Sequence, residues 1–194
     1  GMLLAIPLFH VSGLLVSCLM SLRAQRKLGC LYKWDTEAAL ALIERERLTV
    51  CSAPSAITGD IISAGLRSAR DLSSLRIIGG GGMHRAPEQV KAIGGFSDLL
   101  QPHTGWGMTE TNGLGIRMAG DEYIAHPGAA GRLTPPVQAM RIVDEDGSPV
   151  PSGDVGELQL KSAANMRCYL NQPEATAATL SEGWLKTGDL AYAD

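Results

Sequence analysis

Leu75-Arg-Ile-Ile-Gly-Gly-Gly-Gly82 leads a short apolar run directly into four consecutive glycines. Apolar runs of this length that are bounded by glycine are typical of buried strands. Similar runs alternate with segments of helical spacing from the N-terminus to about residue 110. This alternation predicts a parallel sheet flanked by helices, and such sheets bind ligands beyond the carboxyl ends of their strands. We therefore expect the glycine run to lie at a ligand-binding edge.

Helix-capping residues, prolines at helix starts and the limits of the apolar runs indicate where the other helices and strands of this part begin and end. The expected strands cover residues 3–7, 48–53, 75–78 and 98–101, the last of which leads into a turn at residues 103–106. The expected helices begin near residues 36, 54 and 86. Residues 1–22 carry no charged side chain, but Pro7 and several polar residues interrupt them and no basic region precedes them. We interpret this segment as a strand followed by a buried helix, not as a membrane span or a signal peptide.

The pattern changes after residue 120. Residues 137–143 alternate like a half-buried strand, residues 144–147 have the composition of a turn, and residues 156–161 form the next expected strand. We predict an α/β fold in two parts. Residues 1–120 form a parallel sheet flanked by helices, and residues 121–194 form a smaller, β-rich and barrel-like part.

Composition excludes several classes of protein. The 194 residues include 17 basic and 20 acidic side chains, so charge gives no reason to expect binding to nucleic acid or to an anionic membrane. Hydrophobic residues make up 45%, which is enough for a folded core and excludes disordered and fibrous chains. The four cysteines show no C-x-x-C spacing, so we expect reduced thiols in a cytoplasmic protein and no metal site built from cysteine.

The segment Thr104-Gly-Trp-Gly-Met-Thr-Glu-Thr111 has the residues of a nucleotide site. Its glycines let the backbone approach a flat ligand that stacks on Trp106, while Thr109 can donate to a phosphate and Glu110 can hold a hard divalent cation. From these residues alone, a strand-to-helix turn with Trp106 in the core is an equally good interpretation.

Four segments together resemble the adenylate-forming superfamily, which comprises AMP-forming acyl-CoA synthetases, luciferases and peptide-synthetase adenylation domains. Residues 7–13 resemble its P-x-F-H-x-x-G segment, residues 104–111 its Y-G-x-T-E motif, residues 156–170 its G-E-L-x-x-x-G…Y motif, and residues 183–190 its W-x-x-T-G-D motif. A single motif of this kind is weak evidence, whereas four in the family's order are strong evidence.

The resemblance implies a reaction in two halves. A carboxylic acid attacks the α-phosphate of Mg-ATP to form an acyl-adenylate, and a thiol, usually that of coenzyme A, then displaces AMP. ATP, Mg²⁺ and coenzyme A are therefore the implied cofactor and substrates. Thr109 would bind the α-phosphate and Glu110 the magnesium ion. Trp106 would stack on adenine in place of the family's usual tyrosine, and Asp189 would accept hydrogen bonds from both ribose hydroxyls.

The same resemblance assigns further contacts. The implied catalytic residues are Thr109, Glu110 and His10, with His10 orienting the carboxylate or gating its channel. The implied ATP and AMP contacts are Gly81, Gly82, Met83, Gly105, Trp106, Gly107, Met108, Thr109 and Asp189. The implied acyl pocket consists of His10, Val11, Gly13, Gly81, Thr104 and Gly105. Met83 and His84 stand where the family has alanine and proline, and the larger side chain at Met83 would either narrow the pocket or point away from it.

The substrate class follows from what residues 7–13 lack. Amino-acid-activating domains usually have an aspartate in this region, and no acidic residue occurs here. The apolar neighbours favour a hydrophobic acid, fatty or aryl, and we expect a fatty acid. The partners are thus a small carboxylic acid, ATP and coenzyme A, with no nucleic acid and no membrane span; the sequence makes no prediction of oligomeric state.

The family's phosphate loop and its C-terminal domain with a catalytic lysine have no counterpart in the sequence. We expect a middle piece of a larger ligase that does not turn over by itself. Alternatives are a non-catalytic nucleotide- or acyl-binding module, an adenylation domain that feeds a carrier protein, and an α/β scaffold without a site.

Overall fold

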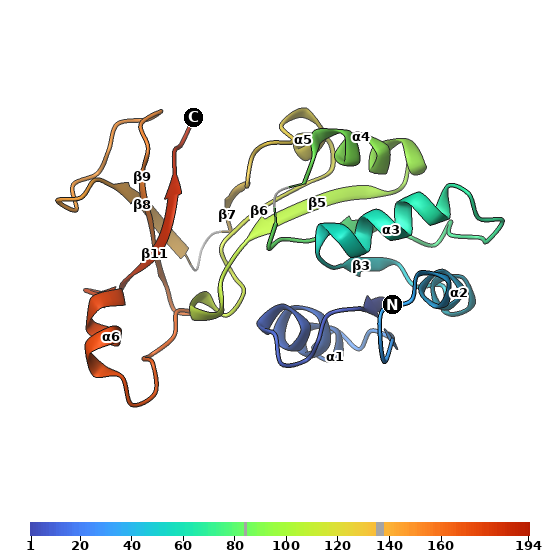
Figure 1. Ribbon diagram of the computed structural model, residues 1–194, viewed down its shortest axis with the longest axis horizontal. Coiled ribbons are helices and arrows are strands. Elements are labelled where there is room, and N and C mark those ends of the chain that lie inside the picture. The colour runs from blue at the N-terminus through green and yellow to red at the C-terminus, as the bar shows by residue number, and fades with distance from the viewer. Residues whose placement is uncertain (84, 135–137) are drawn as a thin grey trace.

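The computed structural model describes residues 1–83, 85–134 and 138–194, which form two β-sheets with most of the helices around the larger one (Figure 1). Strand order is β2-β1-β3-β4-β5-β6-β7 in the larger sheet and β10-β11-β9-β8 in the smaller one. The larger sheet consists of β1 (Met2–Leu4), β2 (Leu28–Cys30), β3 (Val50–Ser52), β4 (Ile77–Gly79), β5 (Gln101–Trp106), β6 (Ile116–Ala119) and β7 (Arg132–Leu133). The smaller sheet consists of β8 (Gln138–Val143), β9 (Gly156–Ser162), β10 (Leu180–Ser181) and β11 (Trp184–Ala191).

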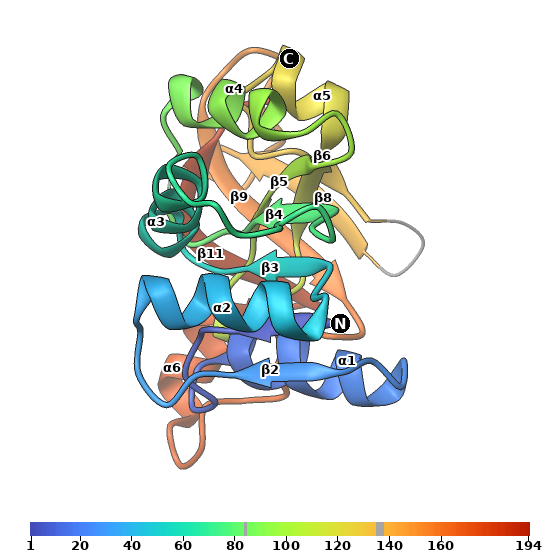
Figure 2. The same cartoon turned by 90° about the vertical axis from the view of Figure 1, so that its right-hand side faces the viewer.

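The helices follow the alternation expected in the first part of the chain. They are η1 (Ser12–Leu19, a π-helix), α1 (Met20–Arg23), α2 (Thr36–Glu46), α3 (Ser55–Gly65), α4 (Pro87–Phe96), η2 (Thr109–Thr111), α5 (Gly120–Ala125) and α6 (Pro173–Thr179). Asp35 caps α2, since its carboxylate accepts the Ala38 N–H at 2.8 Å. Helices α2, α3, α4 and α5 contact one another in turn along the larger sheet (Figure 2).

The larger sheet is mixed. Strands β1 to β5 pair in parallel, whereas β6 and β7 pair antiparallel at its edge. The connection from Trp106 to Ile116 is too short for a parallel crossover, which takes a dozen or more residues, so the chain turns back beside β5. The α/β class and the β-rich second part are confirmed, and the expectation of a wholly parallel sheet is corrected at these two strands. Because β7 belongs to the larger sheet, the division at residue 120 stays a prediction.

The fifth strand lies later in the chain than expected. Residues 98–100 form a turn, closed by the Leu100 N–H donating to the Ser97 carbonyl at 2.9 Å, and β5 then extends through Trp106. Residues 103–106 are therefore strand and not turn. The strand expected at residues 137–143 is β8, with Val137 outside the described residues.

The segment after β1 also differs from its prediction. Instead of a buried helix, η1 and α1 bury their small residues Gly13, Ser17 and Ser21 and expose several leucines. Gly13 allows this approach, because a Cβ there would lie 2.2 Å from the Pro7 carbonyl oxygen. The main core lies between β1, β3, β4 and the helices α2 and α3; Leu3, Leu40, Ile43, Ile61 and Ile78 are fully buried in it.

Candidate nucleotide site

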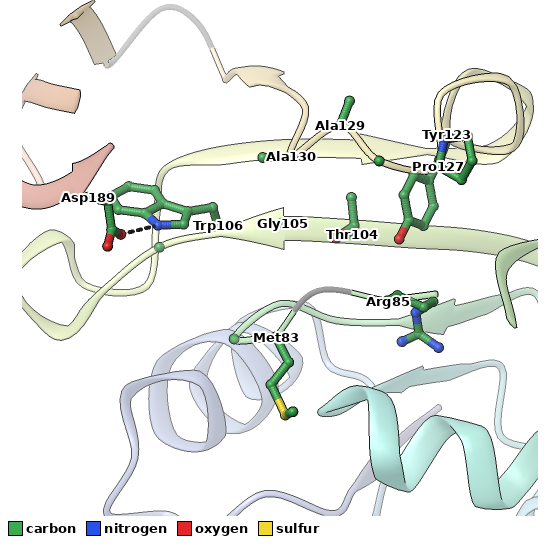
Figure 3. A pocket seen from close by; sticks show the side chains of 13 residues that line it. Met83, Arg85, Thr104, Gly105, Trp106, Tyr123, Pro127, Ala129, Ala130 and Asp189 are labelled. Atoms are coloured by element: carbon green, nitrogen blue, oxygen red, sulfur yellow. Dashed lines mark hydrogen bonds between the residues drawn. The ribbon is translucent and has the colours of Figure 1, made fainter. Parts of the chain in front are cut away.

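A cavity of about 470 Å³ opens at the junction of the two sheets (Figure 3). The loop after β4, strand β5, the segment before β7 and strand β11 each contribute to its wall. Its lining residues are Gly82, Met83, Arg85, Thr104, Gly105, Trp106, Gly107, Tyr123, Pro127, Gly128, Ala129, Ala130 and Asp189. The structure thus brings together seven residues that the sequence assigned to the nucleotide or acyl site: Gly82, Met83, Thr104, Gly105, Trp106, Gly107 and Asp189.

Glycine is required where the loop after β4 meets β5. A Cβ built on Gly81 would lie 1.9 Å from the Gly105 carbonyl oxygen, although Gly81 has no left-handed backbone. Gly82 has φ +87°, with nothing within 4 Å of a Cβ. The first of these glycines allows close backbone contact and the second allows a left-handed turn. Together they place the loop against β5 at the cavity wall, as expected for the ends of parallel strands.

Trp106 and Asp189 meet at one end of the cavity although 83 positions separate them in the chain. The indole Nε1–H donates to Asp189 Oδ2 at 2.6 Å, as the dashed line in Figure 3 shows. Trp106 ends β5, and Asp189 lies in β11 at a shift of register between Lys186 and Leu190. The arrangement puts a flat aromatic surface and an exposed carboxylate side by side, which suits a base joined to a sugar.

The residues after Gly107 form a short turn beside the cavity. Met108 precedes η2, its N–H donating to Thr111 Oγ1 at 3.1 Å, and Thr109 and Glu110 open that helix. Glu110 Oε1 accepts a hydrogen bond from the Tyr169 hydroxyl at 2.8 Å, and its carbonyl accepts one from the Met166 N–H at 2.6 Å. This hydrogen bond to Glu110 raises the pKa of Tyr169 above its usual value, because the carboxylate favours the protonated phenol. Sequence reasoning quoted Tyr169 only as part of a motif and gave it no role.

The Glu110 carboxylate fits a magnesium ion that is shared with phosphates. One of its oxygens accepts from Tyr169, and the other makes no hydrogen bond within the described residues. No group of three or more His, Cys, Asp or Glu side chains in the described part of the chain is placed to hold a metal by itself. Magnesium is commonly bound by one or two carboxylates together with substrate phosphates, so a single acid is the donor set to expect.

The predicted acyl residues at the start of η1 lie apart from the lining of this cavity. His10 is exposed, and its Nδ1 lies 2.7 Å from the Ser12 hydroxyl. Val11 faces the loop after η2, where its methyl carbons approach Gly113. Thr109, Glu110, Met108 and Gly81 also stand outside the lining, while His84 lies outside the described residues.

Two residues that sequence reasoning missed close one end of the cavity. Arg85 is 3% exposed and donates from Nη2 to Thr58 Oγ1 at 2.7 Å, while the fully buried Tyr123 lies beside it. Burial lowers the pKa of Arg85 below its usual value. Burial, and then the charges of Arg85 and Arg117, lower the pKa of His103 to about 4. A lone arginine after a glycine run looks like a solvated loop residue, so no signal in the sequence pointed to this buried cation.

Within the described residues, no helix is both long and apolar enough to cross a lipid bilayer.

Comparison with known proteins gives a consistent result. The family described as AMP-binding enzyme matches residues 1–170. Among curated relatives, 4-coumarate--CoA ligase-like 6 of Oryza sativa subsp. japonica is 36% identical over 193 residues, which is 98% of this chain and 32% of that protein. The chain spans about a third of the length of the curated relatives it matches.

Solved structures of similar sequence share the fold. The N-terminal domain of FACL13 from Mycobacterium tuberculosis superposes with a TM-score of 0.90 at 26% identity, covering 100% of this chain and 48% of that one. O-succinylbenzoate coenzyme A synthetase (MenE) from Bacillus subtilis, in complex with ATP and magnesium ion, superposes with a TM-score of 0.87 at 27% identity, covering 100% and 39%.

Proposed function

The chain belongs to the AMP-binding enzyme family, and on that premise we propose that it supplies the nucleotide-binding part of an AMP-forming ligase. The ligase activates a carboxylic acid with ATP, forming an acyl-adenylate and releasing pyrophosphate. It then transfers the acyl group to the thiol of coenzyme A and releases AMP.

The observation that carries this proposal is the meeting of Trp106 and Asp189 in one cavity. The exposed face of the indole offers a stacking surface for adenine, and the flanking Gly105 and Gly107 also line the cavity. The Asp189 carboxylate accepts hydrogen bonds from the ribose hydroxyls, and bonds to a charged acceptor are the stronger kind. Neither residue type alone indicates a nucleotide, whereas the pair matches a nucleoside in both of its parts.

The turn after Gly107 carries the residues for the phosphates. Thr109 is exposed and supplies a hydroxyl for the α-phosphate, and Glu110 holds the magnesium ion through the carboxylate oxygen that Tyr169 leaves free. A bound magnesium ion neutralises phosphate charge and so reduces the repulsion between the attacking carboxylate and ATP. The MenE structure with ATP and magnesium ion is a similar protein that holds both groups.

For the acid, we propose a hydrophobic one of the fatty type, held near His10, Val11 and Gly13 at the start of η1. The absence of an acidic side chain in residues 7–13 argues against an α-amino acid, whose ammonium group needs a counter-charge. The relative named 4-coumarate--CoA ligase-like 6 makes aryl acids the competing class. A panel of fatty, aryl and amino acids, assayed in the whole ligase as acid-dependent pyrophosphate release, decides between these classes.

Nucleotide binding by the 194-residue chain is the direct test. Isothermal titration calorimetry with AMP should detect binding to the wild type and a loss of about tenfold or more in affinity for Asp189→Ala, because hydrogen bonds to a charged group are involved. Trp184→Phe is the matched control, since Trp184 lies on the same strand but outside the cavity lining. Equal AMP affinity in the wild type and Asp189→Ala would contradict the proposal.

A further inference from the structure

The side chain of Trp106 is held rigidly in place. Its ring packs against the cluster of Ile116, Leu158 and Leu160, which joins the two sheets. The ring also covers Gly115, where a Cβ would lie 2.8 Å from the indole Cε3. A ring fixed by packing on one side presents its N–H in one direction.

The Asp189 side chain, in contrast, is exposed and has few restraints. Its own N–H donates to Thr187 Oγ1 at 3.1 Å, and the preceding Gly188 N–H donates to Glu157 Oε1 at 3.2 Å, so the backbone of this segment is anchored. Within the described residues, the only hydrogen bond to the carboxylate comes from Trp106. An exposed carboxylate samples several rotamers unless a partner selects one, and the indole N–H is that partner.

We propose that the indole N–H of Trp106 is a positioning group for Asp189, so that one side chain both stacks on the base and fixes the acid that binds the ribose. This role rests on the proposed nucleotide site. A carboxylate has about four acceptor positions, and the indole occupies one of them on Oδ2. The remaining positions suffice for two ribose hydroxyls. The contact therefore orients the acid without competing with the sugar.

The role also follows from where the two residues lie. Trp106 belongs to the larger sheet and Asp189 to the smaller one, so the hydrogen bond fixes the acid of one sheet relative to the base-binding surface of the other. Preorganisation of this kind improves affinity because the free protein loses less conformational freedom on binding.

A ligand-free measurement tests the contact itself. In ¹⁵N-labelled protein, the indole proton of Trp106 should shift when Asp189 is replaced, as in Asp189→Ala. Trp34 provides an internal reference, because its indole donates to Asp60 at 2.9 Å, neither residue lines the cavity, and its signal should not respond. A Trp106 indole signal that is unchanged by Asp189→Ala would overturn the proposal whatever the nucleotide affinities are.

Nucleotide analogues test the consequence. Dissociation constants for ATP and 2′,3′-dideoxy-ATP are measured with the wild type and with Trp106→Phe, which keeps an aromatic face and removes the N–H. Loss of the hydroxyls should weaken binding to the wild type by about tenfold or more, and binding to Trp106→Phe by about threefold or less. The control Trp34→Phe removes the same kind of indole-to-carboxylate bond elsewhere and should keep the wild-type ratio.

Failure of the positioning role and failure of the proposed function give different results. An equal hydroxyl penalty in the wild type and Trp106→Phe would refute the positioning role and leave the nucleotide site intact. A wild-type chain that binds neither ATP nor AMP would refute the proposed function and, with it, this role.

Discussion

Replacing Gly81 with alanine is expected to push apart the loop after β4 and strand β5, which together form one wall of the cavity. The new Cβ would lie 1.9 Å from the Gly105 carbonyl oxygen and 2.9 Å from its carbon. Cβ atoms in real proteins essentially never approach closer than 3.0 Å, so the two backbones must separate by about 1 Å. Neither contact atom belongs to a flexible side chain that can move away.

The magnitude follows from that displacement. Backbone shifts forced by added methyl groups typically cost about 1–3 kcal/mol, and a contact with backbone on both sides belongs at the upper end. A loss of about 3 kcal/mol in a chain of this size corresponds to a decrease in Tm of about 6–12 °C. Nucleotide affinity should fall as well, because the displaced Gly105 flanks the stacking surface of Trp106.

Thermal and urea unfolding followed by circular dichroism measure the effect, and two glycines that do line the cavity serve as controls. Gly128→Ala places its Cβ in open space with an ordinary backbone, so Tm should change by about 2 °C or less. Gly82→Ala also meets nothing within 4 Å but has φ +87°, so only the conformational cost of about 1 kcal/mol applies. Identical midpoints for Gly81→Ala and Gly128→Ala would refute the close approach of the loop to β5.

Three further outcomes are expected. Tyr169→Phe removes the hydroxyl that holds one oxygen of Glu110, so the affinity for ATP in the presence of Mg²⁺ should fall by about tenfold. The affinity for AMP without Mg²⁺ should stay unchanged. Both affinities are measured by calorimetry, and an equal loss of the two would contradict this role of Tyr169. The pKa of His103, about 4 in the folded protein and near 6.5 unfolded, means that protonation favours unfolding, so up to about 3 kcal/mol of stability is lost as pH falls from 6.5 to 4. Urea unfolding at several pH values in that range should show that the free energy of unfolding depends less on pH in His103→Gln than in the wild type. The same pH dependence in both proteins would contradict this. Burial raises the pKa of the Cys51 thiol to about 12, so a thiol reagent followed by mass spectrometry should label the exposed Cys30 in the native protein and Cys51 only after unfolding.

The sequence predicted the α/β class well because hydrophobic periodicity is local. Each strand of the parallel part is a short apolar run beside a helix, and Asp35 caps α2 as its residue type indicates. The bounds of β5 were wrong because its residues 103–106 include a glycine and polar side chains, which are typical of a turn. Pairing with β6 on the other side overrides that local preference. Local sequence does not show which other strand a given strand will pair with.

The candidate site also contains residues that the sequence identified and residues that it did not. Trp106 was identified from the residues of its own segment and Asp189 through the resemblance, and the cavity contains both. Arg85 and Tyr123 were missed because their importance arises from burial, which depends on distant segments and not on neighbours in the chain. Tyr169 belonged to a recognised motif, but its contact with Glu110 spans 59 positions and is visible only in three dimensions.

The contacts that join the two sheets show why the site lies at their junction. An apolar cluster of Ile116, Leu158 and Leu160 provides the packing, while the polar contacts are made by residues of the candidate site or their neighbours. Trp106 bonds to Asp189, Tyr169 to Glu110, and the Asn112 amide to the Ala164 carbonyl at 2.6 Å. Each of these bonds links a residue of the β5–β6 connection or its ends to the second part of the chain.

A ligand that engages both Trp106 and Asp189 binds more tightly when the two sheets are docked than when they are separated. The ligand must therefore stabilise the docked arrangement, by the difference between its binding free energies for the docked and the separated arrangements. The linkage also runs in reverse, because weakening the apolar cluster, for instance by Leu160→Ala, should lower nucleotide affinity although Leu160 lies outside the lining of the cavity.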